Sequence, residues 1–242
     1  MTDPPPFGTA PAHIRALDFG HVLVLINYRT GKVQCLLPNA AKHWHDAAAT
    51  GRLASLPPAL STQLLTAGLL RPSATPTPWP APVPAKSAPA SWGSAEHTAG
   101  TIHPAPSPGT ITAAAALTAA LTVKRLGPRS AALHRITTVL AKAASTCRRP
   151  ATHDQAEAAV HAVRRASWYS PARTACLEES AATVLFLASR RLSVTWCHGV
   201  APDPVRLHAW VQTDDGAPAA EPPSTHAYTP ALTIGGHHQH RP

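Results

Sequence analysis

Short apolar runs separated by turn signals characterise the first part of the chain. Residues 21–27 (HVLVLIN) are rich in Val, Leu and Ile and predict a buried strand. The YRTG stretch at 28–31 ends in glycine, as tight turns do, and residues 32–37 (KVQCLL) predict the returning strand. Residues 13–17 predict a further short strand. The pattern therefore indicates a three-stranded sheet that contains a hairpin.

Two helices are predicted after this sheet. Pro38 stands at the start of NAAKHWHDAAA, where the fixed φ of proline suits a first helical turn, and Gly51 ends the segment. Pro58 opens a second helix that has leucines on one face and runs into Gly68. We therefore expect residues 12–70 to form a small α+β domain with a winged-helix-like arrangement.

Proline-rich segments flank this domain. Residues 1–11 are predicted to be disordered, and residues 71–110 are rich in Pro, Ala and Ser and show no hydrophobic period, as expected of a linker. Trp79 and Trp92 lie in that segment, where isolated aromatic side chains are expected to be exposed. The chain is therefore expected to contain two domains, the second at residues 111–242.

The second domain begins with a helical pattern. Apolar residues at helical spacing predict helices at residues 111–126, 130–147, 152–167 and 176–191. Thr152, followed three residues later by Gln155, predicts a capping box at the start of the third helix. Thr174 or a near neighbour is expected to cap the fourth.

The hydrophobic period then changes from helical spacing to two. Residues 194–200, 206–213 and 229–234 predict strands, and Asp214-Asp215-Gly216 predicts a tight turn after the second of them. Helices followed by a small antiparallel sheet constitute an α+β fold.

Composition and charge exclude several classes of function. The 242 residues include 27 Pro, and 21 Lys and Arg against 12 Asp and Glu give a formal net charge of +9. This excess favours an acidic partner. However, the basic residues occur as scattered pairs, and no zinc finger or paired-aromatic RNA-binding motif is present, so we expect no nucleic-acid binding. No stretch reaches the apolar length that crosses a bilayer, so we expect no stable membrane insertion.

The cysteines bear on the cellular compartment. Cys35, Cys147, Cys176 and Cys197 are far apart and form no C-x-x-C pair. The first residues lack the basic start and apolar run of a signal peptide, so we expect a cytoplasmic protein with reduced thiols. The sequence has no G-x-x-x-x-G-K-[ST] motif, the loop that binds nucleotide phosphates. We expect neither a cofactor nor a metal.

Cys176, His208 and Glu221 are the candidate catalytic residues. Cys176 lies in the first turn of a predicted helix, where free N–H groups and the positive end of the dipole favour a thiolate and could also hold an oxyanion. His208 lies within a strand, and Glu221 follows the hairpin turn. Nucleophile, base and orienting carboxylate are the roles these side chains could fill. The alternative is a buried, inert cysteine and a structural histidine.

The C-terminal segments also resemble a known family. The helix start CLEES, the strands TWCHGV and HAWV, and the EPP segment that leads into YTPALTI occur in the order and spacing of lasso-peptide leader peptidases. These are the B proteins of lasso-peptide biosynthesis, transglutaminase-like cysteine proteases that cut the leader from a ribosomally made precursor. The resemblance implies papain-like helices followed by an antiparallel sheet, Cys176 as the nucleophile, His208 as the base and an acidic third member.

The third member has three candidates. Glu221, in the EP dipeptide a dozen or so residues beyond the histidine, matches the position of the family's carboxylate. Asp214 and Asp215 are nearer to His208 in sequence, but the turn itself explains their presence. Glu221 is favoured on this basis.

The N-terminal segments resemble the precursor-recognition (PqqD-like) domain of peptide natural-product pathways. The matching pieces are HVLVLIN, KVQCLL, LPNAAKHW and LPPALSTQLLTAGLL. Such domains bind a leader peptide as an added strand at a sheet edge. Fusion through the linker would raise the effective concentration of leader near the peptidase.

The two resemblances together imply a cysteine endopeptidase that binds and removes the leader of a lasso precursor. The freed core peptide would pass to a separate, asparagine-synthetase-like lasso cyclase. The alternatives are a non-catalytic leader-binding scaffold with a degenerate peptidase domain, and an acyltransferase that uses the same three residues.

Overall fold

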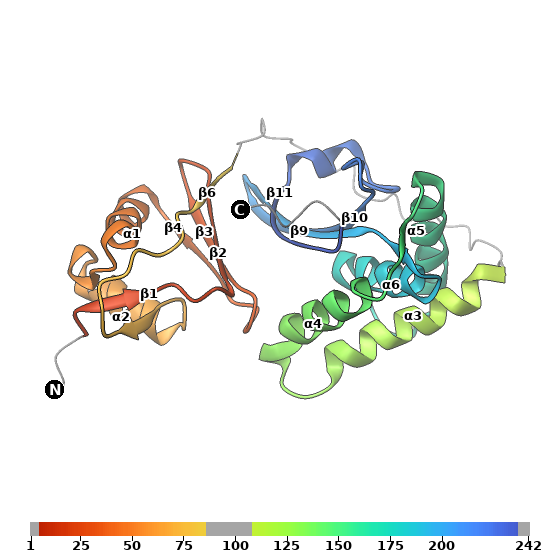
Figure 1. Cartoon of the computed structure of the whole chain (residues 1–242), viewed down its shortest axis with the longest axis horizontal. Coiled ribbons are helices and arrows are strands. Elements are labelled where there is room, and N and C mark those ends of the chain that lie inside the picture. Colours follow the sequence, from red (N-terminus) through yellow and green to blue (C-terminus); the bar gives the residue numbers. More distant parts are fainter. Residues whose placement is uncertain (1–4, 86–107, 237–242) are drawn as a thin grey trace. The chain divides into compact units, whose positions relative to one another are not determined.

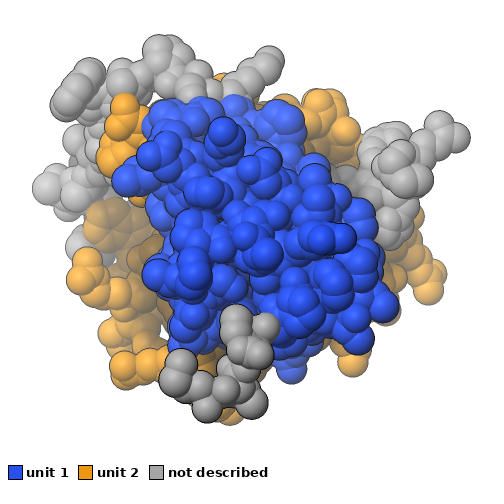
Figure 2. Space-filling view, turned by 90° about the vertical axis from the view of Figure 1, so that its left-hand side faces the viewer, with its two compact units in different colours: residues 1–87 blue, residues 88–242 orange. Residues whose placement is uncertain are grey.

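The computed structural model describes residues 5–85 and 108–236 (Figure 1). The chain divides into two compact units, residues 1–87 and residues 88–242, which Figure 2 distinguishes by colour. Each unit has its own hydrophobic core, and each is described here by itself.

The N-terminal unit is built on a four-stranded sheet. Its strands β2 (Ile14–Asp18), β3 (Leu23–Asn27), β4 (Val33–Leu36) and β6 (Val83–Pro84) lie in the order β4-β3-β2-β6. The three strands expected from the sequence are present and antiparallel. The fourth, β6, pairs in parallel with β2. All five residues of β3 are buried, as its unbroken apolar run indicates.

Helices cover this sheet, as the sequence predicts. Helix α1 (Pro38–Thr50) has proline in its first turn and ends at Gly51, whose φ of 71° is the left-handed conformation that favours glycine. A 3₁₀ turn η1 (Leu53–Ser55) and helix α2 (Pro58–Thr66) follow. Trp44 and Leu64, both fully buried, pack with Leu23 and Leu25 of β3 in one core.

Two flanking segments belong to this unit, contrary to expectation. Strand β1 (Phe7–Thr9) lies within the segment predicted to be disordered and pairs with β5 (Arg71–Ser73), in the predicted linker. Trp79 is buried and stacks on Trp44 with ring centroids 5.2 Å apart. The prediction of an exposed Trp79 was wrong, because composition does not show that Trp44 offers it an apolar surface. Residues 1–4, Trp92 and the rest of 86–107 lie outside the described residues.

Helix α6 lies at the centre of the C-terminal unit. The helices of this unit are α3 (Pro108–Arg125), α4 (Ala132–Ala144), α5 (His153–Trp168) and α6 (Cys176–Ser189), with a 3₁₀ turn η2 (Arg129–Ala131) before α4. Helices α3, α4 and α5 all contact α6 (Figure 1). The capping box of α5 is present as predicted, since Thr152 Oγ1 accepts from Gln155 N and Gln155 Oε1 accepts from Thr152 N. Short strands β7 (Arg149–Pro150) and β8 (Leu192–Ser193) pair in parallel beside these helices.

The sheet of this unit follows the helices in the chain. Strands β9 (Thr195–Pro202), β10 (Val205–Gln212) and β11 (Thr229–Ile234) lie antiparallel in the order β10-β9-β11, and a 3₁₀ turn η3 (Pro223–Ala227) precedes β11. The central strand, β9, is buried along its whole length. The α+β fold predicted for both halves is confirmed. Among the described residues, no helix has the length and apolar character needed to span a membrane.

Candidate active site

The start of helix α6 fixes the position of Cys176, the first residue of that helix. The residue at the N-cap is Ala175, which is extended, and its N–H donates to Glu178 Oε2 at 3.0 Å. Glu178 is buried and also pairs with Lys124 of α3. The N-cap therefore falls on the neighbour of Thr174, and a carboxylate from inside the helix supplies the side-chain hydrogen bond there. Thr174 donates instead to Glu179 Oε1, at 3.1 Å.

Strand β10 presents His208 opposite Gly199 of the central strand β9. The imidazole stacks on Trp210, with centroids 5.8 Å apart, and lies 5.1 Å from the ring of Tyr228. A Cβ on Gly199 would lie 2.8 Å from both the Trp210 ring and the Thr229 carbonyl oxygen. Glycine is therefore required at 199, because the indole beside His208 occupies the space of a side chain.

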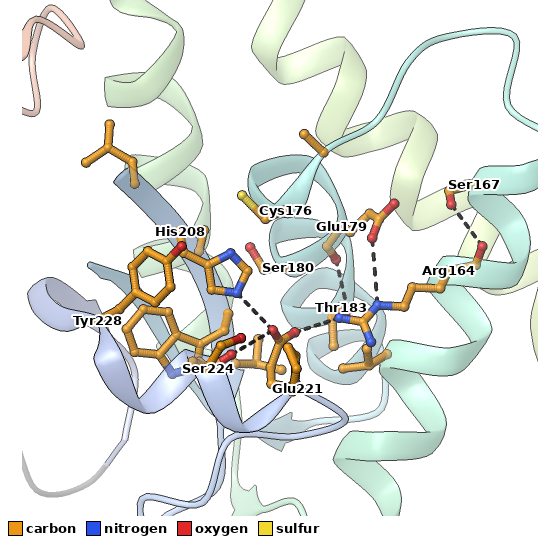
Figure 3. Close-up of a pocket in the computed structure, with 18 of the residues that line it drawn as sticks. Arg164, Ser167, Cys176, Glu179, Ser180, Thr183, His208, Glu221, Ser224 and Tyr228 are labelled. Atoms are coloured by element: carbon orange, nitrogen blue, oxygen red, sulfur yellow. Dashed lines mark hydrogen bonds and ion pairs between the residues drawn. The ribbon is translucent and has the colours of Figure 1, made fainter. Parts of the chain in front are cut away.

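His208 joins the other two candidate residues. Its Nε2 lies 2.8 Å from Glu221 Oε2, in the loop that follows β10. Because Glu221 occupies Nε2, Nδ1 is the nitrogen left to face Cys176, and Figure 3 shows the ring between the sulfur and the carboxylate. The structure therefore brings together Cys176, His208 and Glu221, which are separated by up to 45 residues in sequence.

Arg164, on helix α5, holds the carboxylate of this group. Its Nη2 donates to Glu221 Oε1 and its Nη1 to the Ala220 carbonyl, both at 2.6 Å. Its Nε lies 3.8 Å from Glu179 Oε2. The hydroxyl of Thr225 donates to Glu221 Oε2 at 3.3 Å. The side chain of Glu221 is only 5% exposed, and its charge is balanced by a guanidinium on one oxygen and an imidazole on the other.

The backbone just before Glu221 is strained. Ala220 has a φ of 51°, in the left-handed region that costs a non-glycine residue about 1–2 kcal/mol. The Arg164 bond to the Ala220 carbonyl stabilises this conformation. Non-glycine residues held in such conformations cluster at functional sites. Ala220 directly precedes Glu221, whose carboxylate contacts His208.

The pKa values of the pair follow from these contacts. Burial lowers the pKa of His208, but the hydrogen bonds to Cys176 and Glu221 and the charges of both outweigh it and raise that pKa to about 9. Burial tends to raise the pKa of Glu221, but the hydrogen bond from His208 and the nearby Arg164 charge outweigh burial, so this pKa is lowered. At neutral pH the imidazolium Nε2 therefore donates to an ionised Glu221.

The three side chains line a cavity of about 750 Å³. Two of its lining side chains are apolar and exposed, Trp168 of α5 at 44% and Leu207 of β10 at 41%. Small-molecule and peptide sites have volumes of this order and the same combination of apolar walls with a few convergent polar groups. The cavity can admit a substrate to Cys176.

The two rival carboxylates lie elsewhere. Asp215 Oδ1 accepts from Thr213 Oγ1 at 2.6 Å and from Ala217 N at 3.1 Å, and these two bonds lower its pKa. This is the turn geometry that the sequence predicted for the Asp214-Asp215-Gly216 segment. Neither aspartate lines the cavity, and Glu221 alone of the three contacts His208.

Cys197 and His198, which are adjacent in β9, are outside the site. Cys197 is fully buried in β9, and burial raises the pKa of its thiol to about 12. Burial, followed by the nearby His208 charge, lowers the pKa of His198 to about 4. Neither lines the cavity around Cys176. Within residues 5–85 and 108–236, no three His, Cys, Asp or Glu side chains gather as metal ligands would.

Sequence reasoning missed Arg164, although a signal for it was present. Arg164 follows Val160 by four residues, so both lie on the same face of α5, and Val160 is buried. A charged residue on the buried face of a helix requires a partner. Ala220 gave no signal, because alanine is compatible with ordinary backbone conformations.

A cysteine at a helix N-terminus, with a strand histidine and a buried carboxylate in one α+β unit, is an arrangement typical of cysteine-dependent hydrolases and acyltransferases. The family described as the transglutaminase-like superfamily matches residues 113–233. The chain belongs to this superfamily. Neither the curated proteins nor the solved structures gave a match.

Proposed function

We propose that the chain is a cysteine endopeptidase that removes the leader peptide from a lasso-peptide precursor. The observation that carries the proposal is His208 lying between Cys176 and Glu221, with Nε2 2.8 Å from the carboxylate. Membership of the transglutaminase-like superfamily supports cysteine-dependent chemistry. The resemblance of the CLEES, HAWV and EPP segments to leader peptidases supports the substrate.

The chemistry would proceed in two steps. The Cys176 thiolate attacks the scissile carbonyl carbon, and the tetrahedral oxyanion accepts hydrogen bonds from free N–H groups of the first turn of α6. His208 Nδ1 gives its proton to the leaving amine as the C–N bond breaks, which leaves a thioester on Cys176. Water then attacks the thioester, its proton passes to His208, and the carboxylic acid and the free thiolate are released.

His208 and Glu221 have complementary roles in this scheme. The raised pKa of His208 keeps the imidazolium charged at neutral pH, when the first step needs a proton donor. Glu221 fixes the ring so that Nδ1 faces the sulfur. The exposed apolar side chains of Trp168 and Leu207, which line the cavity, suit an extended peptide more than a small polar substrate.

The N-terminal unit would hold the leader as an added strand. One edge of its sheet, beside β2, is covered by the chain's own β6. At the other edge, β4 pairs only with β3 among the described residues. Val33 and Cys35 of β4 are exposed. An extended peptide could therefore bind the free backbone groups of β4, with side-chain contacts giving selectivity.

The other partner would be the lasso cyclase, which receives the freed core peptide. In this scheme the chain works in the cytoplasm, where the cyclase has ATP and the Cys176 thiol stays reduced. The chain would supply a free N-terminal amine, the group that a subsequent amide-forming reaction consumes.

Incubation of the purified chain with the precursor, followed by mass spectrometry, tests the proposal. We expect two products whose masses sum to the precursor plus one water, and no products with Cys176→Ala. Intact precursor that stays bound would indicate a leader-binding scaffold. A product that lacks the added water would indicate acyl transfer to an amine. Normal cleavage by Cys176→Ala would disprove the assignment of the nucleophile.

A further inference from the structure

A second cavity, of about 500 Å³, lies in the C-terminal unit and has no part in the proposed peptidase chemistry. It is lined by residues of α5, of the C-terminal half of α6 and of the first turn of α3, together with Arg149 of β7, Arg190 just after α6, and Leu192 of β8. Figure 1 shows the start of α3 beside α5, and the two helices are in contact. No residue lines both cavities.

Positive charge dominates this cavity. Arg149, Arg165 and Arg190 all line it, and its lining includes no Asp or Glu. In the part of the chain that the structure describes, no carboxylate forms an ion pair with any of the three. The Nε of Arg165 is buried and has no hydrogen-bond acceptor among these residues. A buried guanidinium N–H without an acceptor is costly, and three like charges around one cavity add repulsion.

One of the three arginines packs on an aromatic ring. The guanidinium carbon of Arg190 lies 4.3 Å from the centroid of the Phe186 ring, which is a cation–π contact. Its N–H groups, which point outward in the guanidinium plane, stay available to an acceptor. Phe186 and Leu187 also line the cavity and give it an apolar floor. The cavity thus combines oriented donors with an apolar wall.

The N-terminus of α3 adds positive potential. Gly109, in the first turn of this 18-residue helix, lines the cavity. The positive end of the helix dipole reinforces the field of the three guanidinium groups.

We propose that this cavity binds a phosphate group, either as inorganic phosphate or as the head group of a small phosphomonoester. A doubly charged tetrahedral phosphate can accept hydrogen bonds from several directions at once, whereas a planar carboxylate is satisfied by one bidentate guanidinium. The bound oxyanion would supply the acceptor that Arg165 Nε lacks. The space beyond the head group would hold an apolar or sugar-like body against Phe186.

Calorimetric titration of the full chain with inorganic phosphate tests this site. The Cys176→Ala protein is used, with chloride replaced so that ionic strength stays constant. The measurement does not involve Cys176. A failure to cleave the precursor would therefore not change the phosphate titration, and a failure to bind phosphate would not change the cleavage assay. We expect saturable binding of one phosphate, weakened about tenfold or more by Arg165→Gln and likewise by Arg149→Gln.

The matched control is Arg129→Gln, which removes the same charge near the other end of α3, about 27 Å away along the helix. This variant should keep the phosphate affinity of the parent. The melting temperature of each variant in chloride shows whether it is folded. Tighter binding of glycerol phosphate than of inorganic phosphate would support a phosphomonoester ligand, and the reverse order would support free phosphate.

Three results would overturn the proposal. The first is no saturable phosphate binding to the folded parent. The second is an equal loss of affinity in Arg129→Gln and Arg165→Gln, which would mean diffuse attraction by the net positive charge. The third is acetate binding as tightly as phosphate, which would assign the cavity to carboxylates.

Discussion

Arg164 Nη2 lies 2.6 Å from Glu221 Oε1 and connects helix α5 to the loop that carries the acidic member of the candidate triad. Glu221 is buried, and the cost of a buried carboxylate is met only if it is paired. The same guanidinium binds the strained Ala220 carbonyl. Arg164 thus positions Glu221.

Replacement of Arg164 by methionine should reduce kcat by up to about 100-fold, the cost of a displacement of ~1 Å in a catalytic group. The substitution also removes a charge that lowers the pKa of Glu221, so that pKa should rise. Glu221 would then be protonated at higher pH, and the acidic limb of the kcat/KM profile should move to higher pH. Kinetics on the precursor across pH measure both effects.

Arg129→Met is the control for this variant, because it removes an arginine that lies outside the candidate site. It should leave kcat and the pH profile unchanged. Arg164→Lys should recover part of the rate, since it restores the charge without the bidentate geometry. An Arg164→Met protein with an unshifted acidic limb would contradict the role of the guanidinium.

The pKa of His208 predicts how stability depends on pH. Because its folded value is raised from 6.5 to about 9, His208 stabilises the fold fully below 6.5, and this contribution is lost as pH rises through 9. The free energy of unfolding of the parent should therefore exceed that of His208→Gln most below pH 6.5, and the difference should shrink toward pH 9. Urea denaturation across that interval measures it. A difference independent of pH would show that the imidazole is not charged.

Most of the longer helices and strands were predicted from the sequence for physical reasons, whereas the roles of Cys176, His208 and Glu221 stay predictions. The helices of both units and the strands β2, β3, β4, β9, β10 and β11 follow from local hydrophobic periods, whereas the short strands β1, β5, β6, β7 and β8 do not. Cys176 is located by the start of an apolar helix. The resemblance to a known family, more than spacing, connected His208 and Glu221 to that cysteine. Contacts that depend on tertiary packing could not be read from local patterns.

Two examples show which contacts local sequence patterns do not reveal. Trp79 lies in a proline-rich segment whose composition predicts exposure, but Trp44 provides a stacking surface that only the folded unit creates. The cap of α6 was expected from Thr174 or a near neighbour, and the N-cap is Ala175, which has no polar side chain. Lys124 of α3 holds Glu178 at the helix start, and Glu178 takes the role of the cap.

Gly199 should be intolerant of a side chain. An added Cβ would lie 2.8 Å from the Trp210 ring and from the Thr229 carbonyl oxygen, and backbone on one side leaves little room for relaxation. Gly199→Ala should destabilise the protein by roughly 1–3 kcal/mol, the usual cost of overpacking, and should displace the ring that stacks on His208. Urea denaturation and kcat measure the two effects.

Gly109→Ala is the matched comparison for stability. The nearest atom to its added Cβ is 3.9 Å away, and alanine is the better helix former. This variant should be as stable as the parent or more so. If Gly199→Ala were equally stable, the close approach of Trp210 to β9 would be wrong.

Trp79→Ala should destabilise the N-terminal unit alone. The indole is buried and stacked on Trp44, and truncation of a buried tryptophan costs about 3–5 kcal/mol. Hydrogen exchange of the β3 amides should accelerate accordingly, whereas β9 of the other unit should keep its protection and serves as an internal control. Val83 lies in the same segment and is half exposed. Val83→Ala should therefore leave the hydrogen exchange of both β3 and β9 unchanged. If the β3 amides of Trp79→Ala kept the protection of the parent, residues 71–85 would be a linker, as their composition suggests, and not part of the N-terminal unit.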